Sequence, residues 1–254
     1  MSPERPVVSF IVPALNEELN LPPLFERLLA LGQRLSWPSE ICVVDDCSRD
    51  ATLRVAQEWQ ARHPQIRPIH KPLPHGLGRG IRTALQHVQG KVGMVVMADG
   101  VDPLEEAVPQ FCRLVLDEGC QLVLLSRYLD PADSQTIPLS YKVHHLLFRF
   151  CTAFLLGIPF RDTTYAFRAF DIPFIRSLNL HSNGFEISPE ITFKTHFSGG
   201  KIGQVAGRQT RRVHGKSNFL FSRAARGYSR ILAEGIYLRV TRNQKSRVAG
   251  HSQG

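Results

Sequence analysis

The sequence predicts an α/β fold in which a mostly parallel sheet is flanked by helices. Over the first 130 residues, short apolar runs of strand length alternate with segments of helical periodicity. The strands are separated by helices, and such connections imply parallel neighbours with right-handed crossovers. At 254 residues, with 43% hydrophobic residues, the chain is also long enough to bury a sizeable core.

The first two strand–helix units have clear boundaries. The apolar run VVSFIVPAL predicts a buried strand at residues 7–15. Residues 17–35 follow as a helix, because leucines recur at helical spacing at Leu21, Leu24, Leu28, Leu31 and Leu35. The stretch EICVVDD predicts a second strand at 40–46, which leads into a helix from about 51 to 62.

The same alternation continues to about residue 130. Strands are predicted at 66–71, 92–99 and 120–128, with helices at 78–90 and 104–119, the latter in spite of Pro109. Residues 7–130 are therefore expected to form one doubly wound, nucleotide-binding half, and residues 131–240 an acceptor-binding half, of a domain that spans 1–240. No internal repeat is present in the sequence.

Polar residues end four of the predicted strands. They are Asn16 and Glu17, Asp45 and Asp46, Asp99 and Asp102, and Ser126 and Arg127. Ligands of open parallel sheets bind outside the carboxyl ends of the strands, so these groups are expected to converge on one cleft. A single Asp at such a position is usually a turn former or a helix cap. Four groups in one sheet favour a ligand site.

Charge is distributed unevenly along the chain. Residues 1–138 contain 13 Lys and Arg against 17 Asp and Glu, a net charge of −4, whereas residues 139–254 contain 18 against 5, a net charge of +13. A basic half indicates an anionic partner, or simply a solvated basic surface. The five cysteines lack metal-ligand spacing, which fits a reducing compartment. No apolar run is long enough to span a bilayer, and no secretory signal precedes the first strand.

Two segments of the basic half are predicted to be amphipathic helices. Residues 140–157 place Lys142, His145 and Arg149 on one face and apolar residues on another. Residues 219–239 repeat the pattern, with Arg223, Arg226 and Arg230. Both are interpreted as interfacial helices, and core packing with a solvated basic face is the alternative. The polar residues 241–254 are expected to be a disordered tail.

An ordered set of motifs between residues 7 and 219 resembles glycosyltransferase family 2. The motifs are PALNEE, VVDDCSRDAT, HGLGRGIRTAL, MADGVDP, SRY, RDTTYAFRAF and RRVHGKSNF. They look most like the dolichol-phosphate mannosyltransferase and polyprenyl-phosphate glycosyltransferase branch. The resemblance implies a Rossmann-like GT-A fold with C-terminal interfacial helices. It also implies an inverting enzyme that moves a sugar from a nucleoside diphosphate, either a GDP- or a UDP-sugar, to dolichyl or undecaprenyl phosphate.

The resemblance assigns the donor site to the first half of the chain. Matching positions imply that the nucleotide is bound by Pro13, Leu15, Glu17, Val44, Asp45, Asp46, Gly76, Gly78 and Ala98. Leu15 stands where the family usually has an aromatic residue, so apolar contact replaces base stacking. One of the paired aspartates is expected to accept hydrogen bonds from the base. Glycines in GLGRG are expected to let the backbone pass close to the nucleotide.

The resemblance also implies a metal site, Mg²⁺ or Mn²⁺, at MADGVDP. Relatives read Asp-Ala-Asp followed by a polar residue, whereas this chain has Met97 and Val101 at the first and last of these positions. Asp99 aligns directly and Asp102 lies one residue off register, so these two are the expected ligands. One carboxylate with substrate phosphates and waters suffices for Mg²⁺, so a metal is expected in spite of the weakened motif.

Catalytic and acceptor-binding roles follow from the same motifs. Asp99, Arg127 and Arg168 are the implied catalytic residues, and the acceptor phosphate is expected to be bound by Arg127, Lys142, Arg211, Arg212 and Lys216. A phosphate acceptor is already ionised at neutral pH and needs no strong base. A hydroxyl acceptor would need one, for which Glu186 and Glu190 are the candidates, unless both are structural.

Three alternatives stay open beside the polyprenyl-phosphate hypothesis. They are transfer to a hydroxyl of a glycan, a catalytically silent sugar-nucleotide-binding partner protein, and, as the weakest, a nucleic-acid binder, for which no recognition module is present. We expect a cytoplasmic protein that is peripheral at the cytoplasmic face of a membrane, with a membrane-embedded partner subunit as a further possibility.

Overall fold

The computed structural model describes residues 7–215 and 221–251, without the side chains of 221–224 and 243–251. The strands are β1 (Val8–Ala14), β2 (Ser39–Asp45), β3 (Ile66–His70), β4 (Val92–Val95), β5 (Leu122–Ser126), β6 (Arg168–Asp171) and β7 (Ile202–Ala206). The helices are α1 (Leu21–Leu35), α2 (Thr52–Arg62), α3 (Leu77–His87), α4 (Leu104–Leu116), α5 (Leu139–Cys151), α6 (Ile172–Ser177), α7 (Ile187–Phe197) and α8 (Phe221–His251). A 3₁₀ turn (Pro131–Ser134) precedes α5, and a π-helical turn (Thr152–Leu156) follows it.

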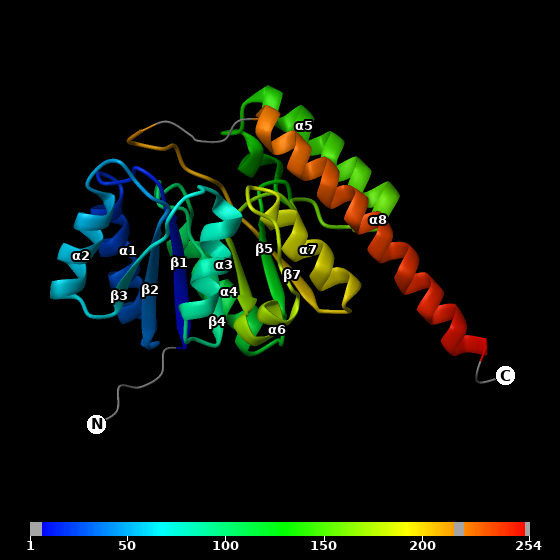
Figure 1. The fold of residues 1–254 in the computed structure, drawn as a ribbon, viewed down its shortest axis with the longest axis horizontal. Coiled ribbons are helices and arrows are strands. Elements are labelled where there is room, and N and C mark those ends of the chain that lie inside the picture. Colours follow the sequence, from blue (N-terminus) through cyan, green and yellow to red (C-terminus); the bar gives the residue numbers. More distant parts are fainter. Residues whose placement is uncertain (1–6, 216–220, 252–254) are drawn as a thin grey trace.

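Seven strands form one sheet in the order β3-β2-β1-β4-β6-β5-β7 (Figure 1). All pairs are parallel except those that β6 makes with β4 and β5. The five strands and four helices predicted for residues 7–128 are confirmed, with shifts of a few residues at their ends. The mostly parallel α/β fold is therefore confirmed, and β6 and β7 are additions that the sequence analysis does not contain.

Helices cover both faces of the sheet (Figure 1). Alternate residues of a strand point to opposite faces, so Phe10 and Val12 of β1 pack in one core cluster while Ile11 packs in the other. The first cluster contains apolar residues of α1 and α4, and the second contains those of α3, α6 and α7. This three-layer arrangement leaves the carboxyl ends of the parallel strands along one edge.

The second half of the chain completes the sheet of the first half. β6 lies between β4 and β5, and β7 pairs with β5 on its other side. Residues 7–130 therefore do not carry the whole sheet by themselves. The two halves share one core, because β6 is buried between strands of the first half and supplies residues such as Ala169 and Phe170 to the two clusters.

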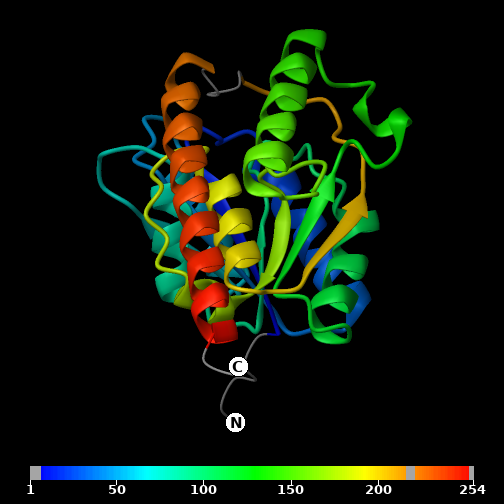
Figure 2. The same cartoon turned by 90° about the vertical axis from the view of Figure 1, so that its right-hand side faces the viewer.

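Helices α5 and α8 lie at one side of the molecule, where α8 packs against α7 (Figure 1). Figure 2 shows α8 in front of α7, with α5 beside it. The contact between α7 and α8 includes Phe193 and Ile231, which are buried together with Leu156. Within residues 7–215 and 221–251, no helix combines the length and the apolar composition needed to cross a membrane.

The helix α8 extends past the point at which the sequence predicts a disordered tail. Its backbone is helical to His251, so the expectation for residues 241–251 is corrected. This segment contains Arg, Gln, Lys and Ala, which favour helix, and lacks proline. Extending a helix that has already formed costs much less than starting one, because each added residue gains a hydrogen bond.

Candidate active site

The paired aspartates at the end of β2 have separate partners. Asp45 is 2% exposed, its Oδ2 lies 2.8 Å from Nδ1 of His70, and its Oδ1 accepts a hydrogen bond from the Ser48 backbone N–H. Asp46 Oδ1 lies 2.6 Å from Nζ of Lys71. These partners offset the repulsion between the two carboxylates, because each negative charge is paired with a nearby donor or cation.

The glycines at the start of α3 pack closely against another segment of the chain. A Cβ at Gly76 would overlap the carbonyl oxygen of Asn183, and a Cβ at Gly78 would overlap that of Ser182. The Gly76 N–H donates a hydrogen bond to Asp46 Oδ2 at 2.7 Å. Glycine is thus required here because α3 packs closely against residues 182–183, whereas the sequence analysis assigned the close approach to the nucleotide.

The remaining predicted nucleotide residues lie at the same strand ends but differ in access. Pro13 of β1 is in register with Val44 of β2, and Val44 is completely buried. Ala98 is 2% exposed, whereas Leu15 is partly exposed. The described geometry therefore leaves the Leu15 side chain open to a ligand, while the side chains of Val44 and Ala98 belong to the core.

Three charged side chains meet beyond the ends of β1 and β4. An Nη atom of Arg212 contacts Oε1 of Glu17, and the other lies 3.8 Å from Oδ2 of Asp99. Oδ1 of Asp99 is buried and accepts no hydrogen bond from the described residues. Burial raises the pKa of Asp99 above its usual value, although the positive charge of Arg212 opposes this shift.

Asp102 does not share this position. It is fully buried, with Oδ1 accepting from the Tyr165 hydroxyl at 2.6 Å and Oδ2 accepting from the Met97 backbone N–H at 2.8 Å. Burial raises its pKa to about 7. Both oxygens fix the turn after β4, so Asp102 is a positioning residue, and the expectation that it is a metal ligand is corrected.

Arg127 is held in a buried ion pair after β5. Its Nε lies 2.8 Å from Oδ2 of Asp162, its Nη1 donates to Oε1 of Gln209, and its guanidinium lies 4.2 Å from the centre of the Tyr165 ring. Burial alone would raise the pKa of Asp162, but the adjacent Arg127 charge outweighs it and lowers that pKa below its usual value. Arg127 is therefore permanently charged and rigidly placed.

Arg168, the third expected catalytic residue, is structural. It is 1% exposed, and burial lowers its pKa to about 10. Its guanidinium donates to the backbone carbonyls of Thr163, Tyr165, Ala166 and Ser188 and to the Thr192 hydroxyl. It thereby ties β6 to α7 and to the loop that carries Asp162. A side chain so enclosed does not reach a substrate, so its predicted catalytic role is corrected to a positioning one.

The chain matches the model of a known protein family. The model described as "Glycosyl transferase family 2" matches residues 9–178, about two thirds of the chain. The chain belongs to glycosyltransferase family 2. The predicted family is thereby confirmed, and the arrangement of strands described above is its GT-A fold.

Several curated relatives of this chain have names that describe transfer to lipid phosphates. The chain is 28% identical over 234 residues to a dolichol-phosphate mannosyltransferase of Pyrococcus furiosus, covering 91% of this chain and 60% of the relative. It is 29% identical to an undecaprenyl-phosphate mannosyltransferase of Micrococcus luteus, covering 77% and 80%. A dolichyl-phosphate beta-glucosyltransferase of Trichomonas vaginalis is 31% identical, but the match covers 41% of this chain and a third of that one. The matched region thus spans only part of the length of these relatives.

Solved structures with the same fold include a glucosyl-3-phosphoglycerate synthase from Mycobacterium tuberculosis. Its complex with Mn²⁺, UDP-glucose and phosphoglyceric acid gives a TM-score of 0.63 at 20% identity, covering 92% of this chain and 79% of that one. At this identity the likeness establishes the fold alone.

The residues of this glycosyltransferase fit a divalent cation at Asp99. The buried Oδ1 atom has no donor, and Glu17 adds a second carboxylate on the other side of the Arg212 guanidinium. Carboxylate oxygens of this kind suit Mg²⁺ or Mn²⁺. Asp99 would hold the ion, which when bound supplies positive charge that stabilises the departing nucleoside diphosphate. Met97 and Val101 offer no side-chain oxygen, so the remaining ligands must come from elsewhere.

The predicted acceptor-side cations do not all converge. Lys142 lies on α5, partly exposed, and Arg211 is exposed on the loop after β7. Arg212 is paired with Glu17 and Asp99 instead. Lys216 lies outside the described residues. Arg127 is therefore the predicted acceptor-phosphate residue whose position the structure fixes most firmly.

The two candidate bases for a hydroxyl acceptor are already engaged. Glu190 is fully buried and accepts hydrogen bonds from the Ser182 N–H and from Lys194 Nζ. Burial favours a higher pKa for Glu190, but these donors outweigh it and leave the pKa below its usual value. Glu186 accepts from the N–H groups of Asn183 and Gly184. Both carboxylates brace the loop before α7.

Sequence reasoning did not single out Asp162, Tyr165 or Lys71. Asp162 and Tyr165 stand in the motif RDTTYAFRAF, from which only Arg168 was selected. Asp162 could have been selected from this motif, because a buried arginine needs a carboxylate partner and Arg127 is such an arginine. Lys71 ends the predicted third strand and offered no such pattern, since its pairing with Asp46 depends on the adjacency of β2 and β3.

Proposed function

We propose that this glycosyltransferase moves a sugar from a nucleoside diphosphate to a polyprenyl phosphate. The donor binds at the ends of β1, β2 and β4, with its base beside Leu15 and Asp46 and its diphosphate at Asp99. The acceptor phosphate binds near Arg127, which supplies a fixed positive charge and needs no general base, because the phosphate is already ionised. The names of the relatives support this choice of acceptor.

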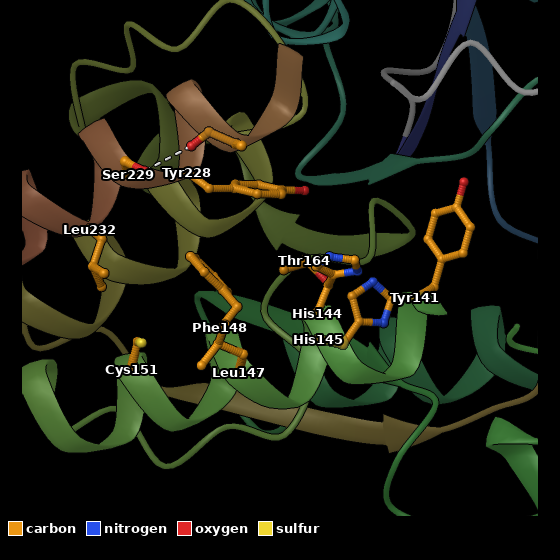
Figure 3. A pocket seen from close by; sticks show the side chains of 11 residues that line it. Tyr141, His144, His145, Leu147, Phe148, Cys151, Thr164, Tyr228, Ser229 and Leu232 are labelled. Carbon is orange, nitrogen blue, oxygen red and sulfur yellow. Dashed lines mark hydrogen bonds between the residues drawn. The ribbon is translucent and has the colours of Figure 1, made fainter. Parts of the chain in front are cut away.

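A single observation carries the choice of a lipid acceptor. A cavity of about 210 Å³ lies between α5 and α8, and its lining is predominantly apolar (Figure 3). Leu147, Phe148 and Cys151 come from α5, and Tyr228 and Leu232 come from α8. An apolar cavity of this kind suits a hydrocarbon chain, since each buried CH₂ contributes about 0.8 kcal/mol.

The cavity is connected through Thr164 and Asp162 to Arg127, the side chain that would bind the acceptor phosphate. Thr164 lines it and donates its hydroxyl to Asp162, the partner of Arg127. His145 also lines it and lies 2.6 Å from the hydroxyl of Tyr128, the residue after Arg127. Burial and the Arg127 charge lower the pKa of His145 to about 4, so it is neutral here. An acceptor with its chain in the cavity would thus have its phosphate close to Arg127.

Transfer in detergent tests this proposal directly. The protein is incubated with radiolabelled GDP- and UDP-sugars and a polyprenyl phosphate, and label is measured in the organic extract. Leu147→Glu places a charge in the cavity and is expected to lower transfer at least about tenfold, because a carboxylate disfavours an apolar chain. Ile236→Glu makes the same change on α8 outside the cavity and is expected to retain transfer.

Nucleotide binding distinguishes a defect in acceptor binding from a defect in donor binding. Calorimetry with GDP and UDP is expected to give equal affinities for wild type and Leu147→Glu, because the cavity lies on the acceptor side. No extractable label with any sugar nucleotide would contradict the lipid acceptor. Label transferred instead to a hydroxyl compound would favour the glycan alternative, although Glu186 and Glu190 are both engaged.

The proposal places the protein at a membrane surface. All thirteen residues of α5 keep some solvent exposure, and Leu139, Val143, Phe150 and the following Phe154 are more than half exposed. The arginines predicted to face the lipid, Arg226 and Arg230 on α8, are exposed, and the side chain of Arg223 lies outside the described residues. Apolar residues that enter the headgroup region beside basic residues are typical of interfacial helices.

Vesicle co-sedimentation tests the membrane contact. Wild type is expected to bind anionic vesicles at low salt and to dissociate as salt rises, because the attraction is screened beyond about 8 Å at physiological ionic strength. Phe150→Glu with Phe154→Glu is expected to stay in the supernatant and to keep its nucleotide affinity. Wild type that fails to bind at low salt would contradict direct membrane contact and favour recruitment by a membrane-embedded partner.

A further inference from the structure

Arg212 lies between the two carboxylates of the donor site. It contacts Oε1 of Glu17 with one Nη atom and lies 3.8 Å from Oδ2 of Asp99 with the other. Its side chain is 18% exposed, and those of Glu17 and Asp99 are 9% and 19% exposed. Two carboxylates that approach each other in a partly buried site repel unless a cation separates them. The guanidinium is the cation that the described residues place there.

This position is also the one that suits a divalent ion. Oδ1 of Asp99 is buried without a hydrogen-bond donor, so the carboxylate is not fully satisfied by Arg212. At 3.8 Å, the contact between Arg212 and Asp99 is an ion pair without a close hydrogen bond. A hard cation with oxygen preference would bind Asp99 more directly than the guanidinium does.

Arg212 belongs to a segment that connects the two substrate sides. We call residues 207–215, which follow β7, the strap. Thr210 of the strap donates its N–H to the Val101 carbonyl at 2.9 Å, close to Asp99. The His214 carbonyl accepts from Asn20, which also donates to Glu17. Gln209 accepts a hydrogen bond from Arg127, so the strap reaches the acceptor side as well.

We infer that Arg212 and a divalent cation are alternative occupants of one site. Without donor, Arg212 neutralises Glu17 and Asp99 and holds the strap across the donor site. When the cation binds Asp99, like-charge repulsion displaces the guanidinium, and the strap is released at that point. The freed arginine is then available to the diphosphate. This inference rests on the proposed function only in that the cation accompanies a nucleoside-diphosphate donor.

Binding of Mn²⁺ alone, measured by electron paramagnetic resonance, tests the competition. Arg212→Ala removes the competitor and is expected to raise the affinity for Mn²⁺ at least about tenfold, because the ion no longer competes with a guanidinium paired to Glu17 and Asp99. Arg211→Ala is the matched control, because it removes the same charge from the adjacent, exposed position. The effect of Arg211→Ala on the affinity for Mn²⁺ reflects only the loss of a more distant positive charge, so it is expected to be much smaller.

Amide hydrogen exchange supplies a second readout in the wild type. Exchange within residues 208–214 is expected to rise as Mn²⁺ saturates the protein, and Arg212→Ala is expected to exchange fast without the ion. Equal Mn²⁺ affinities in the Arg212 and Arg211 variants would overturn the inference, as would exchange within residues 208–214 that stays unchanged while Mn²⁺ saturates the wild type. Neither result depends on whether a polyprenyl phosphate accepts the sugar.

Discussion

Asp99→Asn is expected to lower the rate of sugar transfer by about 10²–10³-fold or more. Asparagine keeps the size of the side chain but loses the charge that holds a hard cation. Loss of the ion removes several kcal/mol of charge stabilisation at the leaving diphosphate, and about 1.4 kcal/mol corresponds to a factor of ten in rate. Single-turnover transfer with saturating donor and Mn²⁺ measures this effect.

The control for this variant is nucleotide binding with and without the ion. In wild type, Mn²⁺ is expected to strengthen UDP or GDP binding, whereas in Asp99→Asn the affinity is expected to be the same in Mn²⁺ and in chelator. The unfolding midpoint is expected to change little, because Oδ1 of Asp99 has no donor to lose. If transfer persists in chelator with Asp99 replaced, arginine or lysine side chains alone stabilise the leaving group.

Asp162→Asn is expected to lower the free energy of unfolding by about 3–5 kcal/mol, because it leaves the Arg127 guanidinium buried without its counter-charge. Arg127 is 6% exposed, and Asp162 receives its Nε hydrogen bond at 2.8 Å. An arginine cannot deprotonate to escape this cost, since its pKa exceeds about 12. Urea denaturation at pH 7 measures the loss.

The reverse substitution provides the comparison. Arg127→Gln leaves a buried carboxylate that can take up a proton, so its cost at pH 5 is expected to be smaller than that of Asp162→Asn. In wild type the pKa of Asp162 is lowered by folding, so the stabilisation from the pair is present above the ordinary Asp pKa of about 3.9 and is lost as pH falls through the folded value. Equal losses for both single variants at pH 5 would contradict this account.

Much of the fold followed from local patterns. The alternation of apolar strands with periodic helices identified the first nine elements, because each pattern is contained within a few consecutive residues. Parallel pairing then placed Glu17, Asp46 and Asp99 at one edge of the sheet, since carboxyl ends of parallel strands coincide. Asp99 was predicted as a metal ligand for a different reason, because MADGVDP resembles the Asp-Ala-Asp motif of the family.

Other features depended on contacts between distant parts of the chain. β6 is four residues long and carries no alternating pattern, and its place between β4 and β5 is decided by pairing with strands from the first half. The glycine loop packs against residues 182–183, a hundred positions later, and so the reason for Gly76 could not be read locally. Burial likewise separated Asp102 from Asp99, although the two stand in one motif.

The sequence by itself determined the parallel sheet, the family and the strand ends at which we propose the donor site, because periodicity and motif order are properties of consecutive residues. Only the tertiary structure decided what each charged side chain does. Arg212 meets Glu17 across 195 residues, and Arg127 meets Asp162 across 35. A charge acts on what lies within a few ångströms of it, and in a folded chain those neighbours are set by packing rather than by sequence distance.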